Sequence, residues 1–156
     1  MTTLLDVPGA LDPSCAYATD AVTMLPGRAA LLDVLALRRP PLGHPASSGV
    51  VLVGLVAPAL PVGAGVLLDV AAALIGALEE GEWVARCGAV EFAVVTEEAL
   101  DAAARRLLTA LDLPVAAGVC PVTAQREAAE VVRLAGLGLA IARQGRPGDL
   151  VRYPTC

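Results

Sequence analysis

The stretch ARCGAVEFAVV, residues 85–95, decides the fold. Two runs that suit β-strands, EWVAR and VEFAVV, flank a short turn at Gly88, and this pattern predicts a tight β-hairpin. One acid, Glu91, opens the second run beside Phe92. Metal-dependent chemistry at such a turn would need at least two carboxylates. The stretch therefore predicts a hairpin that carries only part of a metal-binding set.

Upstream of the hairpin, residues 40–68 contain no Asp, Glu, Lys or Arg. A run this apolar is also typical of a membrane span. Prolines and glycines divide it between residues 58 and 65, and each piece is shorter than the about 20 residues that cross a bilayer. The run therefore predicts a buried strand over residues 50–56 and a helix over 65–80, and no membrane partner.

The rest of the chain alternates helices and strands. Thr96 is expected to cap a helix whose first turn is acidic. The other predicted elements are helices over residues 27–39 and 123–144, the second weakened by Gly136 and Gly138, and strands over 113–120 and 149–153. This order predicts an α/β (α+β) fold with a central mixed, largely antiparallel five-stranded sheet flanked by helices.

Charge and composition narrow the classes of partner. The 156 residues include 11 Lys and Arg against 16 Asp and Glu, a formal net charge of -5. The basic residues form no stripe, which argues against nucleic acid and anionic membrane as partners. Hydrophobic residues make up 56% of the chain but aromatic residues only 3%, so the core is expected to consist of Leu, Val and Ala.

The four cysteines are Cys15, Cys87, Cys120 and Cys156, and the chain has one histidine, His44. No CxxC pair is present, so a zinc site is not expected, and so apolar a chain needs no disulfide framework. Free thiols in a reducing cytosol are the expected state, and we predict a cytoplasmic location.

Several motifs resemble the GGDEF domain of diguanylate cyclases, and the resemblance covers residues 20–153. The matching segments are DAVTMLPGR at 20–28, GAGVLLDVA at 63–71, VARCGAVEF at 84–92, AAGVC at 116–120 and VVRLAGLGLAIAR at 131–143. The resemblance implies a nucleotidyl-cyclase palm-like fold with a βααββαβ core and a link to cyclic di-GMP signalling. Residues 1–19 are then expected to be a loose leader, and residues 20–156 a single degenerate GGDEF-like domain.

The resemblance also implies which site residues are lost. The degenerate signature hairpin comprises Gly88, Ala89, Val90, Glu91 and Phe92. The family's metal-binding acids fall at Gly54 and Val56 in the first strand and at Val90 in the hairpin. We therefore expect no catalytic residue, no metal and no cofactor, so that the chain is not an enzyme.

Two arginines are candidates for residual phosphate contacts. Arg143 stands where the resemblance implies a phosphate-contacting Lys, and Arg146 keeps the family's Arg. Arginines at a helix end also suit the helix dipole and solvent. Arg86, before the turn, is expected to pair with a local acid such as Glu82.

Three functions remain open from the sequence. The first is a catalytically inactive, regulatory GGDEF-like domain that binds a protein partner or forms a homodimer. The second is a non-catalytic nucleotide-binding sensor that uses Arg143 and Arg146 and binds nucleotide weakly. The third is an active diguanylate cyclase that draws missing groups from a partner.

Overall fold

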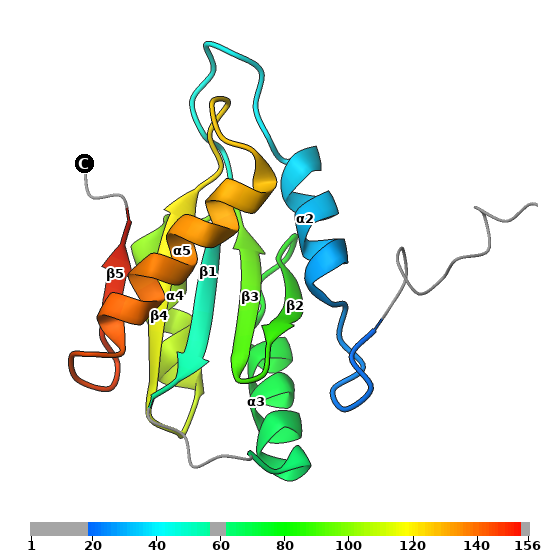
Figure 1. Cartoon of the computed structure of the whole chain (residues 1–156), viewed down its shortest axis with the longest axis vertical. Coiled ribbons are helices and arrows are strands. Elements are labelled where there is room, and N and C mark those ends of the chain that lie inside the picture. The colour runs from blue at the N-terminus through cyan, green and yellow to red at the C-terminus, as the bar shows by residue number, and fades with distance from the viewer. Residues whose placement is uncertain (1–18, 57–61, 154–156) are drawn as a thin grey trace, which may run out of the picture.

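The computed structural model describes residues 19–56 and 62–153, and the predicted leader lies almost wholly outside them. Five strands of the described residues form one sheet in the order β2-β3-β1-β4-β5 (Figure 1). The strands are β1 Gly49–Leu55, β2 Trp83–Gly88, β3 Glu91–Thr96, β4 Val115–Pro121 and β5 Leu150–Arg152. The helices are α2 Arg28–Leu37, α3 Ala64–Ala77, α4 Leu100–Ala110 and α5 Ala128–Ala142.

The sheet is mixed and mostly antiparallel, as predicted. β1 lies at its centre and pairs antiparallel with β3 on one side and β4 on the other. β2 pairs antiparallel with β3 to form the hairpin, and only β5 runs parallel to its neighbour, β4. The resemblance implies two helices between the first two strands, whereas the described residues hold one, α3.

Two helices cover each face of the sheet. α2 and α5 lie in front in Figure 1, with α3 and α4 behind the strands. Every residue of β1 is buried, because alternate side chains pack toward opposite helix layers. Val51 and Val53 belong to the core shared with α3 and α4, whereas Val50 and Leu52 belong to the core shared with α2 and α5.

The backbones of α5 and β4 come into direct contact at Gly138 and Gly118. A Cβ atom on Gly118 of β4 would overlap the main chain of Ala135 and Leu139 in α5. On the helix side, a Cβ atom on Gly138 would crowd the Val151 carbonyl oxygen and contact Gly118. The prediction treated Gly138 as a weakness of the helix, whereas the structure uses it to bring helix and sheet together.

The predicted cap at Thr96 is wrong. Helix α4 begins at Leu100 after Ala99, and no side chain caps it. The Thr96 hydroxyl instead accepts a hydrogen bond from the Glu98 amide at 2.9 Å. Thr96 therefore forms a local turn in which its side chain binds the amide two residues later, and the helix starts after that turn.

The uncharged run divides as the sequence predicts. Its middle part forms the buried strand β1 and its last part enters α3. Over residues 19–56 and 62–153, no helix combines the length and the apolar character that crossing a membrane requires. Gly81, at φ 84°, then allows the turn from α3 into β2.

Candidate functional site

The candidate site lies at the end of the sheet where the β2–β3 turn meets the end of β1 and the end of α5. In the β1–β3 register, Gly54 stands opposite Glu91. The Leu55 amide donates a hydrogen bond to the Val90 carbonyl oxygen at 3.2 Å, which continues the strand pairing into the turn. The central strand thus places its last residues directly beside the signature hairpin.

Arg143, the residue that ends α5, reaches over this junction. Its Nη1 donates to Glu91 Oε2 at 2.8 Å, and its Nε donates to the Leu55 carbonyl oxygen at 3.1 Å. The Arg143 and Glu91 side chains are 26% and 33% exposed, so solvent screens the pair only in part. One planar guanidinium therefore joins β1, β3 and α5.

Gly54 makes room for this guanidinium. A Cβ atom at Gly54 would overlap Arg143 Nη2 and would lie 3.0 Å from Leu139 Cδ2. Arg143 Nη2 is buried and has no hydrogen-bond partner among the described residues. The space in which a side chain at position 54 would lie is therefore filled by the chain's own arginine.

The other two positions expected to have lost metal acids lie on different faces. Val56 packs against the core between the sheet and α2 and α5, and its amide donates to the Pro114 carbonyl oxygen at 2.8 Å. Val90 packs against the core between the sheet and α3 and α4. The structure therefore brings Gly54 and Glu91 together, whereas Val56 and Val90 pack into the cores on opposite faces of the sheet.

Arg86 of β2 binds the turn of the hairpin and the segment before α2. It donates to Asp20 Oδ1 at 2.6 Å, to the Gly88 carbonyl oxygen at 3.2 Å and to the Ala89 carbonyl oxygen at 2.7 Å. The predicted pairing of Arg86 with Glu82 is wrong. The Arg86 guanidinium binds Asp20 instead, and the Glu82 carboxylate binds Arg106.

Asp20 is held by two partners. Its second oxygen accepts hydrogen bonds from the Thr23 amide and the Thr23 hydroxyl, each at 2.7 Å. Burial acts to raise the pKa of Asp20, but the hydrogen bonds from Thr23 and Arg86 outweigh it and lower that pKa to about 2. The carboxylate therefore stays ionised and fixes the segment before α2 to the hairpin.

Glu82 pairs with Arg106 of α4 rather than with Arg86. Arg106 Nη2 lies 2.6 Å from Glu82 Oε2 and 2.9 Å from Glu98 Oε2. The Glu82 side chain is only 3% exposed. Burial acts to raise the pKa of Glu82, but hydrogen bonds, including that from Arg106, lower it below its usual value. This buried pair ties β2 to α4.

The remaining predicted site residues differ in their surroundings. Arg146 is exposed in the turn after α5, and its amide donates to Asp149 Oδ2 at 2.9 Å. Its guanidinium makes no ion pair within the described part of the chain. Cys87 lies in β2, and burial, reinforced by the nearby Glu91 charge, raises the pKa of its thiol to about 12.

The fold is that of GGDEF domains from diguanylate cyclases. No family model and no curated protein matches the chain. A diguanylate cyclase/phosphodiesterase structure from Caldicellulosiruptor saccharolyticus is 18% identical with a TM-score of 0.71, over 86% of this chain and 92% of that one. The GGDEF domain of DgcB from Caulobacter crescentus, in complex with c-di-GMP, is 18% identical with a TM-score of 0.70, over 89% and 97%.

A third similar structure contains a partner protein. It is the diguanylate cyclase SiaD from Pseudomonas aeruginosa in complex with its activator SiaC. SiaD is 21% identical to this chain with a TM-score of 0.72, over 97% of this chain and 66% of that one. At sequence identities this low, the structural similarity shows a shared fold and nothing further.

These comparisons contradict the prediction that the chain is not an enzyme. The structures that share its fold are diguanylate cyclase domains, and diguanylate cyclases are an enzyme family. The prediction rested on the missing acids at Gly54, Val56 and Val90. That count is insufficient, because main-chain carbonyl oxygens and water also bind Mg²⁺. The loss of three carboxylates does not by itself show that turnover is lost.

In residues 19–56 and 62–153, no three His, Cys, Asp or Glu side chains lie together where they could hold a metal ion. Two oxygen donors meet at the junction, the Glu91 carboxylate and the Leu55 carbonyl, and both accept hydrogen bonds from Arg143. The guanidinium thus supplies the positive charge there.

Sequence reasoning identified Arg143 and Glu91 but did not pair them. They are 52 positions apart, and no local spacing signals the contact. The Asp20–Thr23 turn does have a local signal, because an Asp side chain commonly binds backbone amides a few residues on. The Leu55 carbonyl oxygen has none, since a main-chain group carries no sequence signature.

Proposed function

We propose that the chain is a GGDEF-fold regulatory module of cyclic di-GMP signalling that works by binding a protein partner. The observation that carries this proposal is the closed hairpin end. The Arg143 guanidinium binds both Glu91 and the Leu55 carbonyl oxygen, so these groups stabilise the fold. Exposed surfaces are available to bind a partner, and a protein of the same fold, SiaD, is found in complex with its activator.

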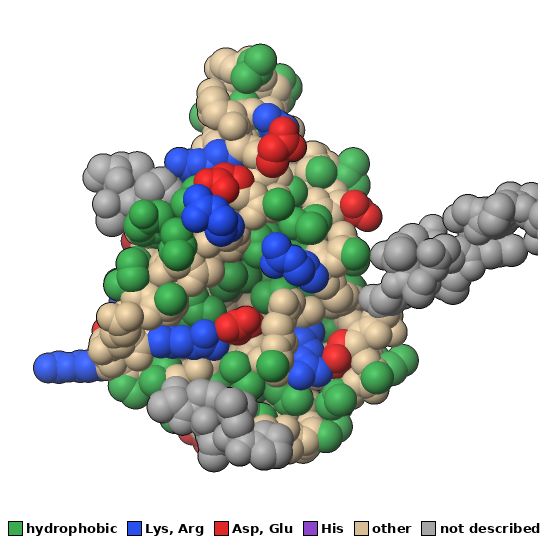
Figure 2. Space-filling model, viewed as in Figure 1, with side chains coloured by type: hydrophobic (Ala, Val, Ile, Leu, Met, Phe, Trp, Pro, Cys, Tyr) green, Lys and Arg blue, Asp and Glu red, His purple; other side chains and the backbone are tan. Residues whose placement is uncertain are grey.

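Exposed apolar side chains support this proposal. Leu68 and Ile75 of α3 are 47% and 51% exposed, and Leu137 and Ile141 of α5 are 38% and 48% exposed. Each pair lies on one side of its helix, because residues four or seven apart share a helix face. Figure 2 shows apolar side chains between scattered basic and acidic ones on the α2–α5 face, without a basic stripe.

The partner is either another protein or a second copy of this chain. We place the complex in the cytoplasm, as the sequence predicts. Cys87 and Cys120 are free thiols in the structure, and free thiols persist in a reducing compartment.

Nucleotide binding is the second candidate function. The observation that favours it is the exposed guanidinium of Arg146, which makes no ion pair with a described residue. Contacts from Arg146 and Arg143 would reach the phosphates of a nucleotide and not its base. Binding should therefore be weak, similar for GTP and ATP, and reduced by salt. Calorimetry with both nucleotides, on the native chain and on Arg146→Ala, tests it.

The partner proposal is tested in the native host. The tagged chain is cross-linked in cells at its natural level, and each captured protein is purified and mixed with the untagged chain. We expect a complex of fixed stoichiometry in sedimentation and an altered cellular cyclic di-GMP level when the chain is deleted. Cyclic di-GMP formation from GTP is measured with and without the partner, which separates partner control from turnover by the chain itself.

The contrary result is equally clear. A chain that sediments as a monomer in cell extract and in every mixture, together with an unchanged cyclic di-GMP level after deletion, would reject the partner proposal.

A further inference from the structure

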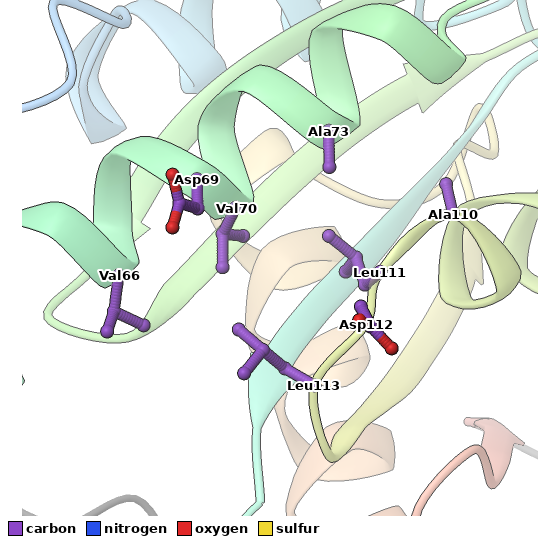
Figure 3. A pocket seen from close by; sticks show the side chains of 8 residues that line it. All are labelled: Val66, Asp69, Val70, Ala73, Ala110, Leu111, Asp112 and Leu113. Atoms are coloured by element: carbon purple, nitrogen blue, oxygen red, sulfur yellow. The ribbon is translucent and has the colours of Figure 1, made fainter.

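A hollow lies between α3 and the segment that follows α4. Figure 3 shows Val66, Val70 and Ala73 on α3 at one side, with Leu111, Asp112 and Leu113 at the other. Its volume is about 260 Å³. This volume is below the roughly 300–1,000 Å³ of pockets that hold small ligands, so the hollow suits one or two inserted side chains rather than a nucleotide.

The hollow has an apolar floor and an apolar rim. Val70 and Leu111 form the floor and are 2% and 8% exposed. Val66 and Leu113 stand at the rim and are each 38% exposed. An inserted aliphatic side chain would cover this exposed apolar surface, which is favourable in water.

Two acids flank the apolar surface from different elements. Asp69 projects from α3 and Asp112 from the segment after α4 (Figure 3). Both are exposed, and neither makes an ion pair or a side-chain hydrogen bond with a described residue. The acids Glu82 and Glu91, in contrast, are each engaged by an arginine. The hollow therefore carries negative charge that the described chain does not neutralise.

This charge selects among occupants. A second copy docked through the same face would bring its own Asp69 and Asp112 against these two, and like charges oppose such a symmetric contact. The chain's residues 1–18 contain Asp6 and Asp12 and no Lys or Arg, so they also carry the wrong sign. A basic partner segment has the complementary charge.

We propose that this hollow docks a basic, amphipathic segment of a partner protein. An aliphatic side chain of that segment enters between Val66 and Leu113, and its Arg or Lys side chains lie beside Asp69 and Asp112. The inference rests on the proposed function, because it names the surface and the kind of partner through which the regulatory module acts.

The probe is a synthetic 14-residue helical peptide of Leu, Ala and Arg with the Leu side chains along one face. The reference peptide is identical except that Glu replaces Arg. Binding to the full chain is followed by NMR amide shifts and by fluorescence anisotropy. We expect the Arg peptide to shift amides of α3 and of the segment after α4, and the Glu peptide to bind at least tenfold more weakly.

The variant Asp69→Asn/Asp112→Asn removes two charges and keeps the side-chain shape. We expect its affinity for the Arg peptide to fall roughly fivefold at low salt, with the difference fading at high salt. The matched control Asp33→Asn/Glu80→Gln removes the same charge at two exposed positions outside the hollow, and should bind like the native chain. Val66→Ser/Leu113→Ser should weaken binding at any salt concentration.

Equal affinity of both charge variants, equal binding of the two peptides, or amide shifts confined to another surface would overturn the inference. So would a native chain that dimerises and a Val66→Ser/Leu113→Ser variant that does not, because the hollow would then be a contact between copies. A native partner that binds Asp69→Asn/Asp112→Asn as tightly as the native chain rejects the hollow and leaves the proposed function standing. Absence of any partner rejects the proposed function, while the peptide titration still reports on the hollow.

Discussion

Arg143 Nη1 lies 2.8 Å from Glu91 Oε2, so the C-cap residue of α5 is joined to the first residue of the second hairpin strand. The same guanidinium binds the Leu55 carbonyl oxygen and covers Gly54. The end of the sheet where sequence reasoning expected an incomplete metal site is thus organised by an internal cation. Its geometry predicts how substitutions at this junction interact.

Gly54→Ala should destabilise the native chain by about 1–3 kcal/mol, because the new methyl group overlaps the Arg143 guanidinium. In an Arg143→Ala background the same change should cost less than about 1 kcal/mol, since only Leu139 Cδ2 remains close. Urea unfolding of the four proteins, followed by Trp83 fluorescence, measures both differences. An equal cost in the two backgrounds would show that the guanidinium does not lie over Gly54.

Arg106→Met should cost about 3 kcal/mol, because it leaves the Glu82 carboxylate, only 3% exposed, without its cation. Adding Glu82→Gln should recover part of that loss. The matched control is Arg133→Met, whose partner Glu130 is 41% exposed. The control should change the unfolding midpoint much less. Similar losses for the two arginines would contradict the assignment of Glu82 as a buried partner.

Asp20→Asn should destabilise the protein by about 1–2 kcal/mol at pH 7. The pKa of Asp20 is lowered to about 2 in the folded state, against an ordinary 3.8. Because the pKa of Asp20 is lower in the folded state, its carboxylate stabilises the fold at every pH above the unfolded-state pKa. This contribution disappears as the pH falls toward 2. The difference between native chain and variant should therefore close from about pH 5 downward.

Urea midpoints at several pH values measure this closure. Asp33→Asn serves as the control, because Asp33 is exposed on α2 and makes no ion pair with a described residue. A pH-independent gap for Asp20→Asn would mean that its charge is not what stabilises the segment.

The thiol of Cys87 should alkylate slowly in the folded protein. Its pKa is raised to about 12 by burial and by Glu91, so almost no thiolate exists at pH 8. Cys120 is fully buried, and burial raises its pKa as well. Iodoacetamide labelling with peptide mass spectrometry should show both reacting more than a hundredfold faster in 8 M urea. Rapid labelling of Cys87 without urea would contradict the burial.

The order of elements could be predicted because it is written locally. The hairpin follows from two strand-like runs around a turn, and the buried central strand follows from a continuous β-branched run. Apart from the local cap at Thr96, the errors concern contacts between distant segments. Arg86 finds Asp20, which is 66 positions away, and Arg143 finds Glu91, which is 52 away. Only the packed fold brings such residues together, so spacing along the chain could not reveal these pairs.

The prediction that the chain is not an enzyme was wrong for a related reason. Residues at Gly54, Val56 and Val90 could be compared with a family motif, but the missing acids describe composition at three positions and not the environment that forms there. The structure adds the Arg143 guanidinium above Gly54 and the carbonyl oxygen of Leu55. Neither group was part of the count of acids on which the prediction relied.

The backbone contact between Gly118 and Gly138 holds α5 against the sheet at a point close to Arg143. Arg143 lies five positions after Gly138, about 7.5 Å along the helix. If α5 tilted by about 10° around this pivot, its end would move only about 1.3 Å. Any larger displacement of Arg143 from Glu91 must lift the helix off the sheet, because there is no layer of side chains at the pivot to deform. The close packing of Gly118 on Gly138, which have no side chains, therefore helps to position the Arg143 charge at the hairpin end.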